Sequence, residues 1–291
     1  MGLSVKLDHL DESKNVEDRR GRRGGLVRGG QIGGLGLIIV VIAALLFGVD
    51  PRQLIGQSGL QPTGAPAESG QPYQESQAEA LLRERSAKVL RSTEIVWTDY
   101  FQNNGQSYPA PGLVLYSGSD QSGCGAAQAG MGPFYCPADQ KVYIDLSFFA
   151  ELSQRFGAPG DFAQAYVIAH EVGHHIQTIL GISGKVNQAR MRLSQAEGNQ
   201  LSVKLELQAD CIAGVWAKRE DAGNRSLEPG DIQEALNAAA SVGDDRLQKQ
   251  TTGTINPEGF THGTAEQRAR WFKTGFESGS IDACDTFSRE P

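Results

Sequence analysis

Residues 166–177, which read YVIAHEVGHHIQ, constrain the fold more than any other stretch of this chain. They hold three of the five histidines in the 291-residue sequence, and a glutamate follows the first of them. The residues before the histidines are apolar, so the segment is predicted to be a buried helix. Burying a histidine pair beside a carboxylate is costly unless something satisfies all three groups. The fold must therefore supply them with a partner, and a metal ion would serve.

His170, Glu171 and His174 form the pattern H-E-x-x-H. The helical period puts the two histidines one turn apart on the same face, where both imidazoles can reach one zinc ion. Glu171 lies one residue round the helix, so it can contact a zinc-bound water without being a ligand. Zinc lowers the pKa of such a water from about 15.7 towards about 7, and a neighbouring carboxylate can take its proton as general base. His175 lies about 100° from His174 and is predicted to be structural or partly solvated.

A catalytic zinc ion needs a third protein ligand and one open position. The candidates are Glu206 and Asp210, which are four residues apart in the segment ELQAD and so share one face of a predicted helix. If Glu206 binds zinc, Asp210 can accept the free imidazole N–H of a ligand histidine and fix its orientation. The alternative is that both acids form ion pairs with Arg or Lys where two helices meet.

His262 precedes the last predicted helix, in the segment GFTHGTAEQRARWF. A histidine at the start of a helix is often a surface or capping residue. Near a zinc site, however, it could stabilise the oxyanion of a tetrahedral intermediate, with Arg268 as an orienting or auxiliary group. His262 is therefore a second candidate catalytic residue, after Glu171.

Residues 32–49, IGGLGLIIVVIAALLFGV, form an uncharged apolar run. As a helix they would cover about 27 Å, close to the ~30 Å hydrocarbon core of a bilayer. A cleaved signal peptide is the alternative, but its apolar run is shorter and a small-residue cleavage site follows. The arginines before the run predict a cytoplasmic N-terminus. We expect a basic cytoplasmic tail over 1–31, a transmembrane anchor over 32–49, a flexible linker over 50–77 and an exported domain over 78–291.

The four cysteines, Cys124, Cys136, Cys211 and Cys284, all follow the apolar run. An even number confined to an exported region predicts two disulfides. Proximity favours Cys124 with Cys136, which leaves Cys211 with Cys284, although three pairings are formally possible. Four buried free thiols are the alternative that a cytosolic location would favour.

The formal net charge of −7 argues against a nucleic-acid partner. A surface that binds phosphates needs clustered Lys and Arg. Residues 1–31 hold seven Lys and Arg against five Asp and Glu, so the rest of the chain carries −9.

The folded domain is predicted to be α+β and mostly helical. A long amphipathic helix opens it over 78–102, and two strands follow over 112–117 and 140–146. The remaining pattern is helical, with helices predicted over 161–180, 188–198, 199–220, 231–245 and 264–276. A few strands followed by many helices indicate a small sheet packed on a helical body.

Five separated blocks of the sequence together resemble the neutral zinc metallopeptidase family of bacteria. They cover most of residues 78–291 and occur in order: CGAAQAGMGPFYCPADQKVYIDLSFFAEL, AYVIAHEVGHHIQ, ELQADCIAGVWA, HGTAEQRARWF and CDTF. H-E-x-x-H followed by E-x-x-A-D is also similar to the gluzincins, including the CAAX-protease branch. Members of the bacterial family are single-pass membrane proteins with an exported domain, which implies the inner (cytoplasmic) membrane here.

The resemblance implies a zincin-like metallopeptidase domain with one zinc ion per chain. By position, Glu206 takes the role of third zinc ligand, and THGTAEQR resembles a THP segment that supports His262. Gly263 departs from that pattern, since the gluzincin branch has proline there. Zincins bind the substrate backbone along an edge strand beside the active-site helix, and the resemblance gives this role to residues 141–146.

The function expected from the sequence is a membrane-anchored zinc endopeptidase whose partner is a peptide or protein substrate. Two alternatives remain open. One is a zinc-stabilised binding or scaffold protein without turnover, and the other is a zinc hydrolase that acts on cell-wall peptides. The presence of Glu171 favours catalysis, because a non-catalytic descendant has no need of an acid there.

Overall fold

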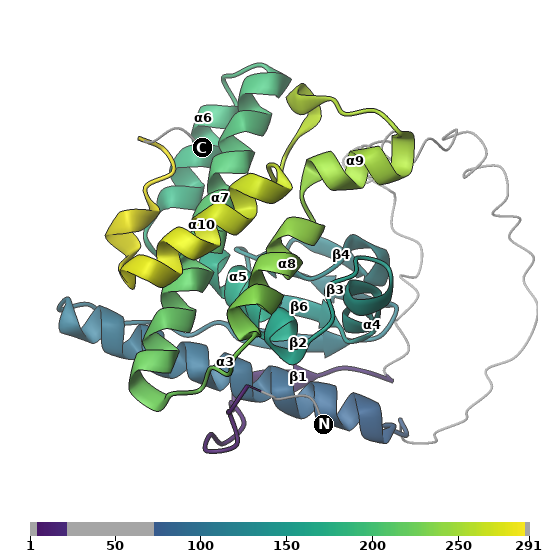
Figure 1. Ribbon diagram of the computed structural model, residues 1–291, viewed down its shortest axis with the longest axis vertical. Coiled ribbons are helices and arrows are strands. Elements are labelled where there is room, and N and C mark those ends of the chain that lie inside the picture. Colours follow the sequence, from purple (N-terminus) through teal and green to yellow (C-terminus); the bar gives the residue numbers. More distant parts are fainter. Residues whose placement is uncertain (1–4, 22–72, 289–291) are drawn as a thin grey trace, which may run out of the picture. The chain divides into compact units, whose positions relative to one another are not determined.

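The computed structural model describes residues 5–21 and 73–288, shown in colour in Figure 1. The strands are β1 (Val16–Asp18), β2 (Gly112–Tyr116), β3 (Ser119–Ser122), β4 (Gly125–Gln128), β5 (Phe134–Cys136) and β6 (Lys141–Asp145). The α-helices are α3 (Gln77–Asn103), α4 (Ser147–Gln154), α5 (Asp161–Ile179), α6 (Ile182–Arg190), α7 (Gln195–Asn224), α8 (Asp231–Ser241), α9 (Asp244–Thr252) and α10 (Ala265–Ser278). Short 3-10 turns are η1 (Ala129–Met131), η2 (Pro257–Gly259) and η3 (Ile281–Cys284). The predicted α+β class, mostly helical with a small sheet, is confirmed.

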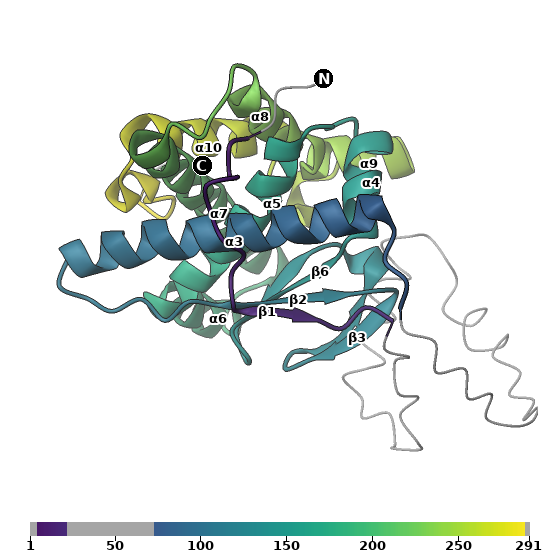
Figure 2. The same ribbon diagram turned by 90° about the horizontal axis from the view of Figure 1, so that it is seen from below.

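Four strands form one sheet in the order β1-β2-β6-β5. β1 and β6 are parallel to β2, whereas β5 runs antiparallel to β6, and β3 pairs with β4 in a separate hairpin. Residues alternate between two faces along β2 and β6. Leu113, Leu115, Val142 and Ile144 belong to the main core with the helices, and Val114 and Tyr143 belong to a smaller cluster on the other face. Figure 2 shows the long helix α3 lying over the sheet.

The edge of the sheet beside α5 is β5, not the predicted segment 141–146. β6 lies between β2 and β5 and pairs with both, so it is an internal strand. β5 contains only three residues, between Pro133 and Pro137, which is too short to show an alternating pattern in the sequence. The prediction that 141–146 is the edge strand is therefore wrong.

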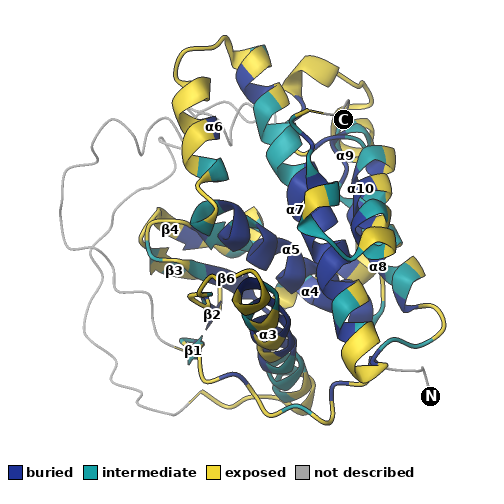
Figure 3. Ribbon diagram, turned by 90° about the vertical axis from the view of Figure 1, so that its left-hand side faces the viewer, coloured by how far each residue is buried: buried dark blue, intermediate teal, exposed yellow. Residues whose placement is uncertain are grey.

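The helical body is built around α5, which is buried along most of its length, whereas α6 is largely exposed (Figure 3). α5 packs against α7 at Gly173, where an added Cβ would lie 3.0 Å from the carbonyl oxygen of Ala209. α7 in turn crosses α10 at Gly214 and Gly275, where an added Cβ would overlap the backbone of the other helix. These close approaches place the three helices that carry the polar site in direct contact.

α7 is longer than predicted, because the predicted break near Gly198 does not occur. Ser194 and Glu197 form a capping box that starts the helix, since each side chain satisfies a free backbone N–H of the other. Gly198 therefore lies in the first turn of α7. The connection from α6 runs over residues 191–194 instead.

The N-terminal segment, residues 5–21, belongs to the folded unit that contains residues 74–288. β1 pairs with β2, Val5 and Leu7 are buried in the main core, and the hydroxyl of Ser13 donates a hydrogen bond to Glu94. The sequence predicted a separate tail over 1–31. It did so because a three-residue strand surrounded by charged residues carries no visible periodicity.

This packing bears on the predicted topology. A helix that crosses a membrane once has its two flanks on opposite sides, whereas residues 5–21 and 74–288 share one fold and so lie on one side. The predicted orientation, with the N-terminus and the domain separated by a single crossing, is incompatible with it. Residues 32–49 themselves lie outside the described residues. Among the residues that are described, no helix has the length and apolar character needed to span a membrane.

Both predicted disulfides are confirmed. Cys124 is bonded to Cys136, and Cys211 is bonded to Cys284. The first joins the β3–β4 hairpin region to the edge strand β5. The second ties α7, the helix that carries ELQAD, to η3 near the C-terminus.

Candidate metal centre

His170, His174 and Glu206 converge at one point between α5 and α7. Nε2 of His170 lies 3.2 Å from Oε2 of Glu206, and Nε2 of His174 lies 3.4 Å from Oε1 of the same carboxylate. One potential ligand atom from each residue falls within 4.8 Å of the others. Two ligand atoms of a tetrahedral zinc ion are roughly 3.4 Å apart, given Zn–N and Zn–O distances of about 2.0–2.2 Å. The donor set and its spacing fit one zinc ion.

The other nitrogen of each imidazole is held by a neighbouring side chain, which leaves Nε2 directed at the shared point. Nδ1 of His170 lies 2.8 Å from Oδ1 of Asp210, and Nδ1 of His174 lies 2.9 Å from Oε1 of Gln177. A proton on Nδ1 that is donated to an oxygen leaves the Nε2 lone pair free for a metal. Gln177 lies one turn beyond His174 on α5, and its contact with His174 was not foreseen.

Without a metal, burial and the charges of neighbouring groups shift the pKa values of the three residues in opposite directions. Burial lowers the pKa of His170, but Asp210 and Glu206 raise it by more, to about 10. Burial also raises the pKa of Glu206, but the two histidines lower it by more, so its pKa is held well below its usual range. The carboxylates thus raise the pKa of both His170 and His174, so they favour positive charge at the point where a divalent cation would bind.

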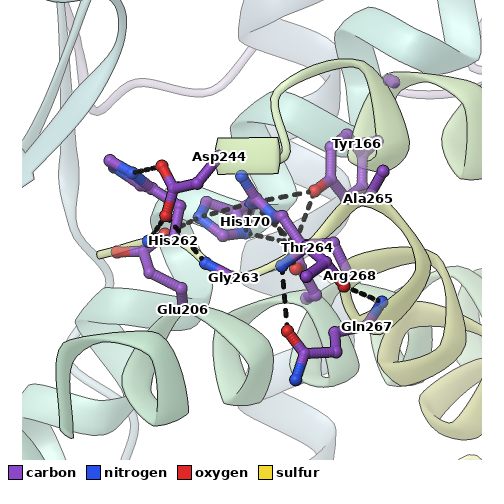
Figure 4. Close-up of polar contacts among 12 residues, drawn as sticks. Tyr166, His170, Glu206, Asp244, His262, Gly263, Thr264, Ala265, Gln267 and Arg268 are labelled. Atoms are coloured by element: carbon purple, nitrogen blue, oxygen red, sulfur yellow. Dashed lines mark hydrogen bonds and ion pairs between the residues drawn. The ribbon is translucent and has the colours of Figure 1, made fainter. Parts of the chain in front are cut away.

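Asp210 is fully buried and binds three side chains. Besides His170, it accepts hydrogen bonds from the hydroxyl of Tyr166 at 2.5 Å and from Nε and Nη2 of Arg268 at 2.8 and 3.0 Å. Arg268 is 3% exposed and extends from α10 (Figure 4). Burial raises the pKa of Asp210, but Arg268 and His170 lower it by more, so the carboxylate stays charged. Arg268 therefore orients Asp210, and both expected partners of this acid, a ligand histidine and an arginine, occur together.

Glu171 is buried and lines a cavity of roughly 480 Å³ that opens beside the centre. Within residues 5–21 and 73–288 no hydrogen bond or ion pair to its carboxylate occurs, in contrast to Glu206 and Asp210. Its carboxylate is thus available to a water molecule in the cavity. This is the environment that a general base requires.

His262 lines the same cavity, and Asp244 holds it there. Oδ2 of Asp244 accepts hydrogen bonds from three consecutive backbone N–H groups, those of Thr261, His262 and Gly263, at 2.7, 2.6 and 3.1 Å. Oδ1 lies 3.1 Å from Nδ1 of His262. Desolvation in the cleft lowers the pKa of His262, but the hydrogen bond to Asp244 and the nearby Glu206 raise it by more.

Gly263 explains why this loop departs from the THP pattern. Its φ is +88°, a value that proline cannot adopt, and an added Cβ would lie 3.1 Å from Val203 and 3.3 Å from Leu207 on α7. Glycine at this position lets the loop pass close to α7. The loop that carries His262 to the cavity therefore has a backbone conformation that a loop with proline at position 263 could not adopt.

Asp244 was not singled out from the sequence. The only local signal was a pair of aspartates after Gly243, which is typical of a helix start, and α9 does begin at Asp244. Its contact with His262, eighteen residues later, depends on how α9 and the loop before α10 pack. No sequence pattern carries that information.

His175 is structural and not solvated, since its side chain is fully buried. Its Nε2 lies 2.6 Å from the carbonyl oxygen of Pro109, and its Nδ1 lies 3.0 Å from the hydroxyl of Tyr135. Burial lowers the pKa of His175, which keeps the ring neutral.

The α+β fold brings the H-E-x-x-H helix and the carboxylate of Glu206 together in a site whose donor set fits one metal ion. The chain belongs to the family described as "Putative neutral zinc metallopeptidase", whose family model matches residues 5–287. The match begins within the N-terminal segment, in agreement with its place in the fold.

Relatives of high similarity occur in distant bacteria. The chain is 49% identical over 292 residues to "Uncharacterized protein YpfJ" of Escherichia coli K12. The match covers 96% of this chain and 97% of the relative. It is 44% identical over 259 residues to "Uncharacterized protein Rv2575" of Mycobacterium tuberculosis, which covers 84% of this chain and 85% of the relative. No solved structure matches the chain significantly.

Proposed function

We propose that this chain is a zinc-dependent endopeptidase that hydrolyses peptide bonds with Glu171 as the general base. The observation that carries the proposal is the convergence of two imidazole Nε2 atoms and one carboxylate within 4.8 Å. Beside them lies the buried carboxylate of Glu171, which has no hydrogen-bond or ion-pair partner among the described residues. His170, His174 and Glu206 would hold the zinc ion. When bound, zinc would acidify a water molecule and polarise the peptide carbonyl.

The other residues would divide the remaining work. Glu171 would take the proton of the attacking water and pass it to the leaving amine. His262, whose raised pKa favours the protonated ring, would donate a hydrogen bond to the oxyanion. Asp210 would keep His170 oriented, and Arg268 would keep Asp210 charged.

The edge strand β5 supports a peptide or protein as the substrate. Within the part of the chain that the structure describes, β5 pairs only with β6, and residues 131–135 line the cavity next to His170 and Glu171. The unpaired backbone groups of β5 can bind an extended peptide as an additional strand. Endopeptidase activity follows, because an extended substrate continues past the site in both directions.

We also propose that the domain works in an oxidising compartment, the periplasm or the cell exterior. Two disulfides and no free cysteine in the described residues support this location. Anchoring through residues 32–49 remains a prediction. If it occurs, the packing of β1 requires the N-terminal segment to lie on the same side as the domain.

The test is to purify the full-length protein, measure bound zinc, and compare cleavage of an unfolded protein with the Glu171→Gln variant. Zinc should stay near one per chain in both, and the rate should fall by about 100-fold or more, as expected for loss of a general base. Glu266→Gln, at an exposed position on α10, is the matched control and should leave the rate unchanged. No cleavage by either protein, with zinc bound, would mean a zinc-stabilised binding protein without turnover, and equal cleavage by both would exclude Glu171 as the general base. Cleavage of cell-wall peptides but not of proteins would assign the same chemistry to a different substrate.

A further inference from the structure

His175 connects the metal-binding helix to two other segments of the fold. It follows the proposed ligand His174 on α5, and its ring is fully buried. A carbonyl oxygen can only accept, so Nε2, which lies 2.6 Å from the oxygen of Pro109, carries the proton. Nδ1 of the neutral ring then accepts the hydrogen bond from the hydroxyl of Tyr135 at 3.0 Å. One side chain thus joins α5 to the loop before β2 and to the edge strand β5.

Aromatic contacts enclose the same ring. Tyr135 and Tyr108 meet His175 edge-on, with ring centroids 5.4 and 5.7 Å away. Tyr108 in turn stacks on Phe101 of α3. The ring therefore has a single position, and both of its hydrogen bonds are fixed in direction.

Tyr135 is the central residue of β5. Its strand neighbour is Val142 of β6, and among the described residues no strand pairs with the other side of β5. The distance between β5 and α5 depends on contacts between the strand and the helix. The hydrogen bond from Tyr135 to His175 is a polar contact of this kind, and it lies one residue from a proposed zinc ligand.

We propose that His175 is a positioning residue that sets the distance between the edge strand β5 and the metal-binding helix α5. An extended peptide bound along β5 would then lie at the distance from Glu171 that the attack of water requires. This inference rests on the proposed peptidase function. It gives His175 a role in substrate alignment and none in metal binding or proton transfer.

The experiment compares an extended peptide of about eight residues with a blocked dipeptide, which is too short to pair along β5. Tyr135→Phe removes one hydroxyl and should lower kcat/KM for the long peptide by about five- to tenfold, mainly through KM, with little change for the dipeptide. A merely structural role would lower both substrates alike. Tyr116→Phe, which removes a buried hydroxyl that has no hydrogen-bond partner among the described residues, is the matched control and should change neither.

Two substitutions of the histidine separate its two bonds. His175→Asn keeps an acceptor near the position of Nδ1 and should preserve most of the preference for the long peptide. His175→Gln keeps a donor near the position of Nε2 and should behave like Tyr135→Phe. Zinc content should stay at the wild-type value in each variant.

Hydrogen exchange of the β5 amides provides a measurement that does not depend on activity. Tyr135→Phe and His175→Gln should speed exchange at residues 134–136 by severalfold and leave the middle of α5 unchanged. Equal losses for both peptides, with exchange at β5 unchanged, would overturn the proposal. If the wild-type protein cleaves no peptide, the proposed function fails. Faster exchange at β5 in these variants would still support the role of His175 in positioning β5. Unchanged exchange would refute that role.

Discussion

Asp244 holds both the backbone and the ring of His262. Its Oδ2 accepts from the His262 backbone N–H at 2.6 Å, and its Oδ1 lies 3.1 Å from the ring Nδ1. A ring that donates from Nδ1 can also donate from Nε2 only when it is protonated. The raised pKa of His262, to which Asp244 contributes, therefore supports its role as an oxyanion donor.

Asp244→Asn should move the alkaline limb of the activity profile to lower pH. Asp244 raises the pKa of His262, so the charged ring persists to higher pH in the wild type. Removing the carboxylate lowers that pKa, and the charged form is lost earlier as pH rises. We expect roughly a tenfold lower kcat at pH 8 and a small change at pH 6, with zinc content unchanged.

The control for this prediction is Asp245→Asn. Asp245 lies next to Asp244 at the start of α9 but accepts from the backbone N–H of Ala265 and does not contact His262. It should leave the position of the alkaline limb unchanged. The same limb in wild type and Asp244→Asn would remove Asp244 from the mechanism.

Glu206→Ala should abolish stable zinc binding, because the two histidines alone leave the ion with too few protein ligands. Asp210→Asn should weaken zinc affinity less, by about 10- to 100-fold, since it acts through the orientation of His170. Competition with a chelator of known affinity measures both. Wild-type affinity in Glu206→Ala would transfer the ligand role to another residue.

The sequence revealed those parts of the site whose geometry is local. One helical turn joins His170 to His174, and one turn joins Glu206 to Asp210, so the helical period alone placed each pair on a common face. That the two pairs lie close together was a hypothesis from the sequence. Their contact depends on the close packing of α5 on α7 at Gly173. The pairing of Cys124 with Cys136 followed from their short separation along the chain, which left Cys211 to pair with Cys284.

What the sequence could not reveal depends on contacts between distant segments. β5 and β1 are strands of three residues, too short for an alternating pattern, and their places at the two edges of the sheet follow from pairing alone. The contact of Asp244 with His262 and that of His175 with Tyr135 both join segments with no shared periodicity. The charged residues around β1 favoured instead the prediction of a basic cytoplasmic tail over residues 1–31.

Leu7→Ala should destabilise the domain although Leu7 lies before the apolar run and far from the rest of the core in sequence. Leu7 is 4% exposed and packs in the main core, so its truncation leaves a cavity. We expect a loss of about 2–4 kcal/mol in the free energy of unfolding, measured by urea titration of the full-length protein. Leu81→Ala, at a position that is 57% exposed, is the control and should cost far less. A negligible effect of Leu7→Ala would mean that residues 5–21 do not pack on the domain in solution.

Asp231→Asn should stabilise the protein at neutral pH and not at pH 4. Burial and the nearby carboxylates of Asp161 and Glu234 raise the pKa of Asp231 to about 6, above its value of about 3.8 in an unfolded chain. Between about pH 3.8 and pH 6 the folded state therefore keeps a proton on Asp231 that the unfolded chain has lost. The free energy of unfolding of the wild type falls as pH rises through this range. Asparagine cannot ionise, so the variant escapes this loss above pH 6 and still accepts the hydrogen bond from the backbone N–H of Glu228.

We expect Asp231→Asn to gain about 1–2 kcal/mol at pH 7.5, an increase of a few degrees in Tm, and to match the wild type at pH 4. Asp99→Asn, at an exposed position on α3, should change Tm at neither pH. Thermal unfolding of the three proteins at both values of pH measures the difference. A gain that appears only at pH 7.5 would show that ionisation of Asp231 destabilises the folded state. An equal change at both values of pH would instead mean that Asp231 is not protonated in the folded state.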